Sequence, residues 1–221
     1  VENKTRVRRI RSKVVASFII RDNLRSSDKL ESLWEKVLPM IGPGSRIVFC
    51  GDYIDRGSES YRVLEMLGAI SKQHDAVFLE GNHESMLEGF LAGDPLIAAS
   101  YRFNGGDRTI ESYRREFGTF HLPESHKRIL FSRTFVYEGD DFYVVHAGFD
   151  PDLPDPLDTD PQDLMWIRDR FYNSAKVWDK TVIFGHTPTF YMGLPLGRIF
   201  VDNERHLMGI DTGAVYGGML T

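Results

Sequence analysis

Residues 46–57 read RIVFCGDYIDRG, a short apolar run that ends in a Gly-Asp turn. Such a run, bounded by turn residues, is typical of a buried strand. A second run of the same kind, Ala76–Leu79, ends at Gly81, and the residues between the two runs show helical spacing over Tyr61–Ser71. Short apolar strands that alternate with helices predict an α/β fold.

The rest of the chain continues this pattern with one interruption. Asp28 is placed to cap a helix that runs to Val37. Further strands are expected at Phe142–His146, Thr181–Phe184, His206–Ile210 and Ala214–Leu220. Within residues 91–130, Asn104-Gly-Gly106 marks a turn, and helices are expected at Asp107–Phe117 and Pro123–Leu130. We expect this segment to be a small helical cap over the strand ends, within a single domain that spans residues 1–221.

Composition narrows the class of protein. Apolar residues make up 42% and charged residues 27% of the 221 residues, which is ordinary for a globular domain. The longest predominantly apolar stretch, Val14–Ile20, is far shorter than the roughly 20 residues that a membrane-spanning helix needs. Cys50 is the only cysteine, which rules out an internal disulfide and fits a reducing compartment. We therefore expect a cytoplasmic protein with no membrane partner.

Residues 1–25 form an atypical basic stretch in a chain whose net charge is −5. A signal peptide is disfavoured, because the apolar segment is short and is followed by Arg21-Asp22-Asn23 instead of a small-residue cleavage site. A basic arm on an acidic enzyme is the preferred interpretation. Nucleic-acid binding is a weaker alternative.

Four short motifs follow the predicted strands, each at the point where a strand ends. They are Gly51-Asp52-Tyr53-Ile54-Asp55-Arg56-Gly57, Gly81-Asn82-His83-Glu84, His146-Ala147-Gly148 and Gly185-His186-Thr187-Pro188. Ligands collect at the carboxyl ends of strands in open α/β sheets, so these motifs should converge. Each motif alone also fits an ordinary turn or a packed histidine. Four in order, with oxygen and imidazole ligands, indicate a site for a divalent metal such as manganese, iron or zinc.

With these motifs the chain resembles the calcineurin-like metallophosphoesterases, and in particular the bacterial and phage Ser/Thr protein phosphatases of that superfamily. The resemblance extends from Asp28 to Thr221 and includes Asn104-Gly-Gly106, Trp166-Ile-Arg168 and Ile210-Asp-Thr-Gly213. It implies a sandwich of two mixed sheets flanked by helices, with a metal site at one edge under the cap. It also implies a phosphoesterase that uses two divalent metals, manganese foremost and iron or zinc as alternatives.

The resemblance implies a role for each matching residue. Asp52 would bridge both metals, and the second metal would also bind Asn82, His146 and His186. His83 would be the general acid, oriented by Asp55, and the phosphate oxygens would be held by Arg56 and Arg168. This chemistry is consistent with the residue types. Imidazole is well matched to protonating a leaving alkoxide, and guanidinium groups match phosphoryl oxygens.

The chain departs from the family pattern where the first metal should bind. The family has Gly-Asp-x-His-Gly there, whereas alignment on the following helix places Asp22 on the metal-binding Asp and Leu24 on the histidine. Arg21 and Arg25 then replace the two glycines. Leucine is no metal ligand, so the first site is expected to be weak or empty. Three explanations stay open: a locally corrupted sequence over residues 1–25, a natural variant, or a phosphate-binding relative without catalysis.

The leading functional hypothesis is metal-dependent hydrolysis of a phosphomonoester, with phosphoserine or phosphothreonine in proteins as the substrate. The Asp55-Arg56-Gly57 ending of the first motif favours protein phosphatases. The alternative enzyme is a symmetrical dinucleoside tetraphosphate hydrolase. The alternative from another class is a catalytically impaired phosphate-binding protein, which Leu24 and Arg25 suggest.

Overall fold

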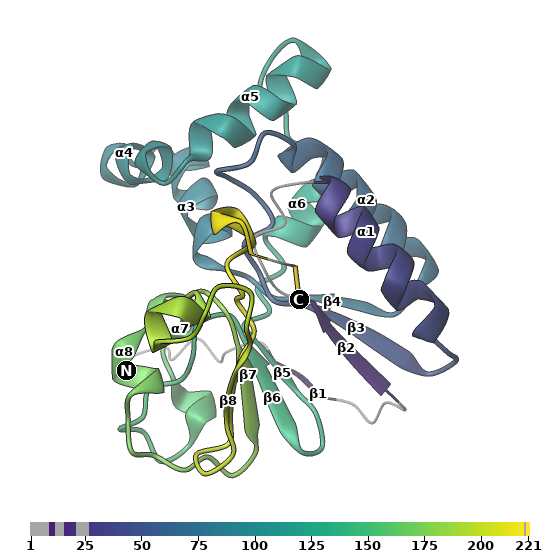
Figure 1. Ribbon diagram of the computed structural model, residues 1–221. Helices are drawn as coiled ribbons and strands as arrows, with labels where there is room; N and C mark the ends of the chain where they lie inside the picture. Colours follow the sequence, from purple (N-terminus) through teal and green to yellow (C-terminus); the bar gives the residue numbers. More distant parts are fainter. Residues whose placement is uncertain (1–8, 12–15, 21–26, 219) are drawn as a thin grey trace.

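The computed structural model describes residues 9–11, 16–20, 27–218 and 220–221, and these residues form two β-sheets flanked by helices (Figure 1). The larger sheet has six strands in the order β1-β5-β6-β7-β9-β8. Their bounds are Arg9–Arg11, Val136–Glu138, Phe142–Val145, Thr181–Phe184, Leu207–Gly209 and Phe200–Asp202, respectively. The smaller sheet has the order β2-β3-β4, with bounds Ala16–Ile20, Ser45–Phe49 and Ala76–Phe78. The predicted α/β sandwich is therefore confirmed.

The two sheets differ in strand direction. The larger sheet is mixed, because β5–β6 and β8–β9 are antiparallel while the other pairs are parallel. The smaller sheet, expected to be mixed as well, contains only parallel pairs among the described strands. The reason lies in its connections. Helices α1 (Ser27–Val37) and α2 (Ser60–Gln73) lie between its successive strands, and such crossovers return the chain in the same direction.

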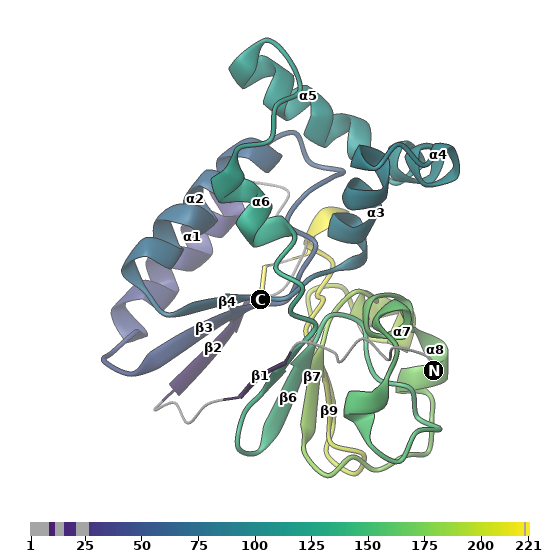
Figure 2. The same ribbon diagram turned by 180° about the vertical axis from the view of Figure 1, so that it is seen from behind.

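Alternating side chains of β3 define the layers. Val48 and the following Cys50 face the larger sheet and join a cluster with Val144 and Ile183 from that sheet. Their neighbours Ile47 and Phe49 point the other way, into the core under α1 and α2. This is the twofold periodicity of a strand that is buried on both faces. Figures 1 and 2 show α1 and α2 on the outer face of the smaller sheet, with α7 (Pro161–Trp166) and α8 (Asp169–Tyr172) beside the larger one.

Residues 91–130 are helical, as expected for the cap. After α3 (Asn82–Leu91) the chain forms α4 (Pro95–Phe103), α5 (Gly106–Phe117) and α6 (Glu124–Leu130). Helices α4 and α5 lie in the part of the molecule away from the larger sheet in both views (Figures 1 and 2). Among the described residues, no helix combines the length and the apolar character that a bilayer crossing requires.

One predicted strand is wrong. Residues 214–220 were expected to be extended, but Ala214–Tyr216 forms a short 3₁₀ helix. Gly213 and Gly217 flank it with φ of 75° and 96°, so the chain turns at both ends. Further 3₁₀ turns cover Leu38–Met40, Pro156–Asp158 and Thr189–Met192. Strands β1, β5 and β8, three residues each, were not predicted.

Candidate metal centre and active site

The four predicted ligands of the second metal come together from the ends of four elements. Asp52 follows β3, Asn82 begins α3 after β4, and two histidines follow the neighbouring strands β6 and β7. One ligand atom each of Asp52, His146 and His186 lies within 4.8 Å of the other two. Oδ1 of Asn82 lies 3.0 Å from Nε2 of His146. All four side chains are buried, and their carboxylate, amide and imidazole groups suit a divalent cation.

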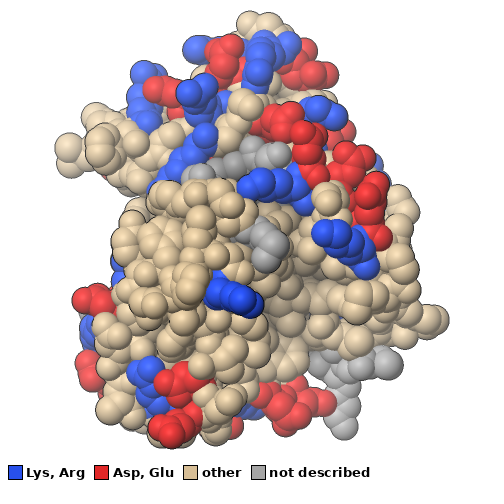
Figure 3. Space-filling model, viewed as in Figure 1, with Lys and Arg blue, Asp and Glu red and all other residues tan. Residues whose placement is uncertain are grey.

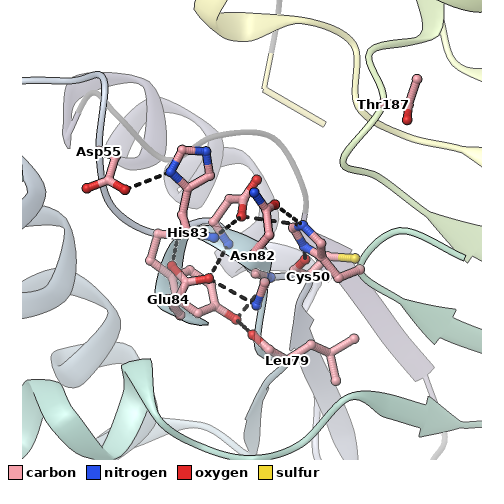
Figure 4. Close-up of polar contacts among 12 residues, drawn as sticks. Cys50, Asp55, Leu79, Asn82, His83, Glu84 and Thr187 are labelled. Carbon is pink, nitrogen blue, oxygen red and sulfur yellow. Dashed lines mark hydrogen bonds and ion pairs between the residues drawn. The ribbon is translucent and has the colours of Figure 1, made fainter. Parts of the chain in front are cut away.

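The tautomer of His146 follows from its surroundings. Its Nδ1 lies 2.7 Å from the carbonyl oxygen of Cys50, which only accepts, so this nitrogen carries a hydrogen (Figure 4). In a neutral ring Nε2 then presents its lone pair toward Asn82 and, at 3.4 Å, toward Oδ1 of Asp52. A backbone carbonyl that fixes the far nitrogen is the usual support of a metal-binding histidine. The residues present therefore fit a metal ion.

Strained backbone accompanies these side chains. Asp52 and His186 have φ of 60° and 63°, and Asp55 and Arg56 have φ of 73° and 53°. Left-handed backbone is uncommon outside glycine and persists where the surroundings hold it. Four of the six such non-glycine residues in the described part of the chain belong to the candidate site. The strained backbone therefore lies at residues that are predicted to bind the metal or to take part in catalysis.

Glu84 connects the two loops that carry Asp52 and Asn82. Its carboxylate accepts hydrogen bonds from the backbone N–H groups of Asp52 (2.8 Å), Tyr53 (2.8 Å) and Gly81 (3.0 Å). Burial, and next the negative charge of Asp52, raise the pKa of Glu84, while the backbone donors act in the opposite direction. Glu84 lies within the second motif, but no role was predicted for it. Its position three residues after the N-cap residue Gly81, as in a capping box, was the available signal.

Gly81 allows these loops to approach. A Cβ atom at this position would lie 2.6 Å from Oδ1 of Asp52 and 2.6 Å from Cε1 of His146. Such distances are shorter than any normal contact. The glycine is therefore required by the closeness of the ligands.

His83 and Asp55 form a buried pair beside the metal ligands. Nδ1 of His83 lies 2.7 Å from Oδ2 of Asp55, and the two residues are 2% and 0% exposed (Figure 4). The backbone N–H of His83 donates to Oδ1 of Asp52 at 3.3 Å. The second oxygen of Asp55 accepts from the hydroxyl of Thr109 at 2.7 Å, a contact that the sequence analysis missed.

Both predicted arginines lie at the same cavity. It has a volume of about 480 Å³, and Asp52, Asn82, His83 and His186 contribute to its wall together with Arg56 and Arg168. A guanidinium N–H of Arg168 donates to the hydroxyl of Thr187 at 3.3 Å. On the face seen in Figure 3, the acidic side chains of the described residues gather toward the edges. The cavity thus combines candidate metal ligands, a histidine and two cations suited to an anionic group.

The remaining predicted ligand, Asp22, lies outside the described residues, as do Arg21, Leu24 and Arg25. Strand β2 ends at Ile20, whose carbonyl accepts the N–H of Cys50 at 3.1 Å. The carboxyl end of β2 therefore lies beside that of β3, which carries Asp52. The assignment of Asp22 to a first metal stays a prediction.

This fold and this site together define a metal-dependent phosphoesterase. The family model for calcineurin-like phosphoesterases matches residues 24–211, so the chain belongs to that family. A Geobacillus thermodenitrificans protein named bis(5'-nucleosyl)-tetraphosphatase PrpE (asymmetrical) is 27% identical over 222 residues, which cover 88% of this chain and 81% of that protein.

Solved structures share the fold. A crystal structure of a protein assigned as a diadenosine tetraphosphatase superposes with a TM-score of 0.65 at 16% identity, covering 94% of this chain and 89% of that one. A protein Ser/Thr phosphatase from Saccharomyces cerevisiae gives a TM-score of 0.56 at 19% identity, over 88% of this chain and 66% of that one. These similarities confirm the architecture.

Proposed function

We propose that this protein hydrolyses phosphomonoesters, with phosphoserine or phosphothreonine in proteins as the foremost substrate class. The observation that carries the proposal is that His83, which is paired with Asp55, and two arginines line the cavity that contains the candidate metal ligands. Phosphoserine has a poor leaving group, and a positioned acid is the device that such a substrate needs. The single Cys50 fits a cytoplasmic location for this enzyme.

The residues that would hold the second metal are Asp52, Asn82, His146 and His186, with Asp22 as a ligand of the first metal. Manganese is the foremost candidate, and iron or zinc are alternatives. When bound, divalent ions neutralise phosphoryl charge and lower the pKa of a coordinated water. Arg56 and Arg168 bind the outer phosphoryl oxygens, since a guanidinium group offers a matching fork of donors.

His83 delivers the proton to the leaving oxygen. Because its Nδ1 donates to Asp55, the other nitrogen, Nε2, is the one available for the substrate. The carboxylate of Asp55 holds the ring at Nδ1, so Nε2 is left to face the leaving oxygen. The same contact fixes the ring plane. Proton transfer therefore occurs at one defined atom.

A second candidate function is the hydrolysis of dinucleoside tetraphosphates. Tyr191 and Tyr216 line the cavity and are 62% and 49% exposed, so their rings are accessible for stacking against a nucleobase. The name of the Geobacillus relative supports the same substrate class. That name specifies asymmetrical cleavage, whereas the sequence alone suggested the symmetrical reaction as the alternative.

The two candidate functions are separated by measuring kcat/KM with manganese for a phosphoserine peptide and for diadenosine tetraphosphate. A higher value for the peptide supports the protein phosphatase. A higher value for the dinucleotide supports the second candidate. Its products then tell symmetrical cleavage, which gives two diphosphates, from asymmetrical cleavage, which gives a mono- and a triphosphate.

His83→Asn should lower turnover of the phosphoserine peptide by roughly 10²–10⁴-fold and that of p-nitrophenyl phosphate much less. Phosphate binding without turnover of any of these substrates would identify the phosphate-binding protein instead.

A further inference from the structure

We infer that Thr109, on the cap helix α5, is a positioning residue that holds Asp55 and thereby orients His83. The inference rests on the proposed function, in which His83 is the general acid. Thr109 is 54 residues from Asp55 in sequence and is completely buried. It does not line the cavity, so it would act only through Asp55.

The hydrogen bonds of Thr109 have one consistent assignment. Its hydroxyl has a single hydrogen, which must go to Oδ1 of ionised Asp55 at 2.7 Å because that oxygen only accepts. The same hydroxyl oxygen accepts the backbone N–H of Asp55 at 2.9 Å. Ser60, whose hydroxyl lies 3.0 Å away, must then donate to the second lone pair. Thr109 therefore binds both the side chain and the backbone of Asp55 and has no hydrogen-bonding capacity left.

This arrangement fixes which oxygen of Asp55 meets the histidine. Since Oδ1 accepts from Thr109, Oδ2 faces Nδ1 of His83 at 2.7 Å. A carboxylate held at one oxygen only would be able to turn about its side-chain bonds. Held at both, it fixes the ring of His83 and the direction of Nε2.

The first turn of α5 also supports the strained loop around Asp55. Asp55 and Arg56 both have left-handed backbone, and their N–H groups donate to Thr109 and to the carbonyl of Gly105, respectively. A Cβ atom on Gly105 would lie 2.9 Å from the backbone nitrogen of Arg56. The loop is thus contacted by the hydroxyl group of Thr109 and by the backbone of Gly105. These contacts stabilise a backbone conformation that is otherwise unfavourable.

Helix α5 is itself held in register by residues on the same face. Ser112 accepts the backbone N–H of Tyr61 at 3.0 Å, and the hydroxyl of Tyr113 lies 2.7 Å from Nδ1 of His126. These residues follow Thr109 by three and four positions, so they share its side of the helix. Because more than one contact holds the helix, loss of the Ser112 hydrogen bond alone should leave Thr109 in place beside Asp55. Such support is what precise orientation of an acid requires.

The test compares Thr109→Val with Thr109→Ser and Ser112→Ala. Valine keeps the shape of threonine without its hydroxyl, and serine keeps the hydroxyl. Ser112 is the matched control because it accepts the backbone N–H of Tyr61 at the start of α2 without contacting Asp55. We expect Thr109→Val to lower kcat on a phosphoserine peptide by roughly 10- to 100-fold. On p-nitrophenyl phosphate the loss should stay within about twofold, with metal content and KM unchanged, because its leaving group needs little protonation. Thr109→Ser should restore most of the activity.

Each outcome decides the inference. Equal losses on both substrates in Thr109→Val, or the same leaving-group dependence in Ser112→Ala, would show that Thr109 merely supports the fold. His83→Asn serves as the reference for the proposed function. If it shows no leaving-group dependence, the acid role of His83 fails. If it shows the dependence and Thr109→Val does not, only the role of Thr109 fails.

A spectroscopic readout is independent of turnover. The Nδ1–H proton of His83, buried and 2.7 Å from Asp55, should give a downfield proton resonance that His83→Asn removes. Thr109→Val should broaden or shift this resonance, whereas Thr109→Ser and Ser112→Ala should preserve it. An unchanged resonance in Thr109→Val would overturn the inference, whether or not the enzyme turns over a given substrate.

Discussion

Nε2 of His146 lies 3.0 Å from Oδ1 of Asn82, and each atom offers a lone pair when the imidazole is neutral. Two acceptors at this distance repel one another unless a proton or a cation lies between them. In the neutral ring the one N–H hydrogen is on Nδ1, which donates it to the carbonyl oxygen of Cys50. Nε2 therefore has no hydrogen to donate to the amide oxygen of Asn82. The pair is therefore arranged for a positive ion, and Asp52 adds a negative charge to the same space.

Removal of single ligands should lower metal content. His186→Ala and Asn82→Ala each delete one donor from a set whose members lie close together, so both variants should bind less manganese after dialysis. Elemental analysis of the purified variants measures this. His121→Ala, an exposed histidine away from the cavity, is the matched control and should match the unmodified protein. Unchanged metal stoichiometry in both ligand variants would contradict the assignment.

Gly81→Ala should impair metal binding without adding or removing a donor. The new methyl group would lie 2.6 Å from a carboxylate oxygen of Asp52, so the two ligand loops must separate. We expect reduced manganese affinity in a calorimetric titration, together with reduced phosphatase activity. Gly42→Ala, where an added Cβ meets nothing within 4 Å, provides the control. Equal affinities for the two variants would mean that the loops tolerate the separation.

Restoring the family residues at the first metal position should increase metal binding. Leu24 and Arg25 lie outside the described residues, so this prediction rests on the sequence alignment. Arg25 would repel a cation at 4 Å by about 1–4 kcal/mol, depending on the effective dielectric constant. The double substitution Leu24→His with Arg25→Gly should raise both the number of bound manganese ions and the activity. Two tightly bound ions in the unmodified protein would show that the alignment of Asp22 is wrong.

Acidification should destabilise the fold through His126. Burial lowers the pKa of this histidine, and the nearby Glu65, 2.8 Å from its Nε2, only partly opposes the effect. A lowered pKa in the folded state means that the unfolded chain binds the proton first. The free energy of unfolding should therefore decrease as the pH falls below about 6.5, the usual value for histidine.

Urea unfolding of the metal-free protein at pH 7.5 and pH 5.5 measures this effect. His126→Gln should reduce the difference between the two pH values, whereas His121→Gln, on the exposed surface, should leave it unchanged. The comparison with a variant is needed because burial raises the pKa of Glu80 and Glu84, which shifts stability in the opposite direction. An identical pH dependence in His126→Gln and the unmodified protein would contradict the prediction.

The convergence of Asp52, Asn82, His146 and His186 could be predicted because each residue lies within a few residues of the end of a strand. Strand ends at one edge of a sandwich meet, so sequence position alone brings such residues together. The burial of both faces of β3 could be predicted equally well, since the consecutive apolar residues Ile47, Val48 and Phe49 leave neither face polar.

The contacts around Asp55 could not be predicted in the same way. Thr109 and Ser112 stand in the polar-looking helix α5, where hydroxyl groups ordinarily face solvent. Their burial depends on how α5 packs against α2, which local periodicity does not specify. The strand predicted at 214–220 was wrong for a different reason, because there the local sequence pattern itself was misleading. Its apolar residues resemble a strand, but the left-handed glycines at 213 and 217 turn the chain at both ends.

The candidate ligands are divided between the two sheets. Asp52 and Asn82 follow strands of the smaller sheet, whereas His146 and His186 follow strands of the larger one. A bound ion would thus act as a cross-link between halves of the molecule, in the manner of a disulfide that closes a loop of more than a hundred residues. Because an ion that binds only the folded state stabilises it by mass action, the supply of metal would govern the lifetime of the protein against unfolding and proteolysis as well as its turnover.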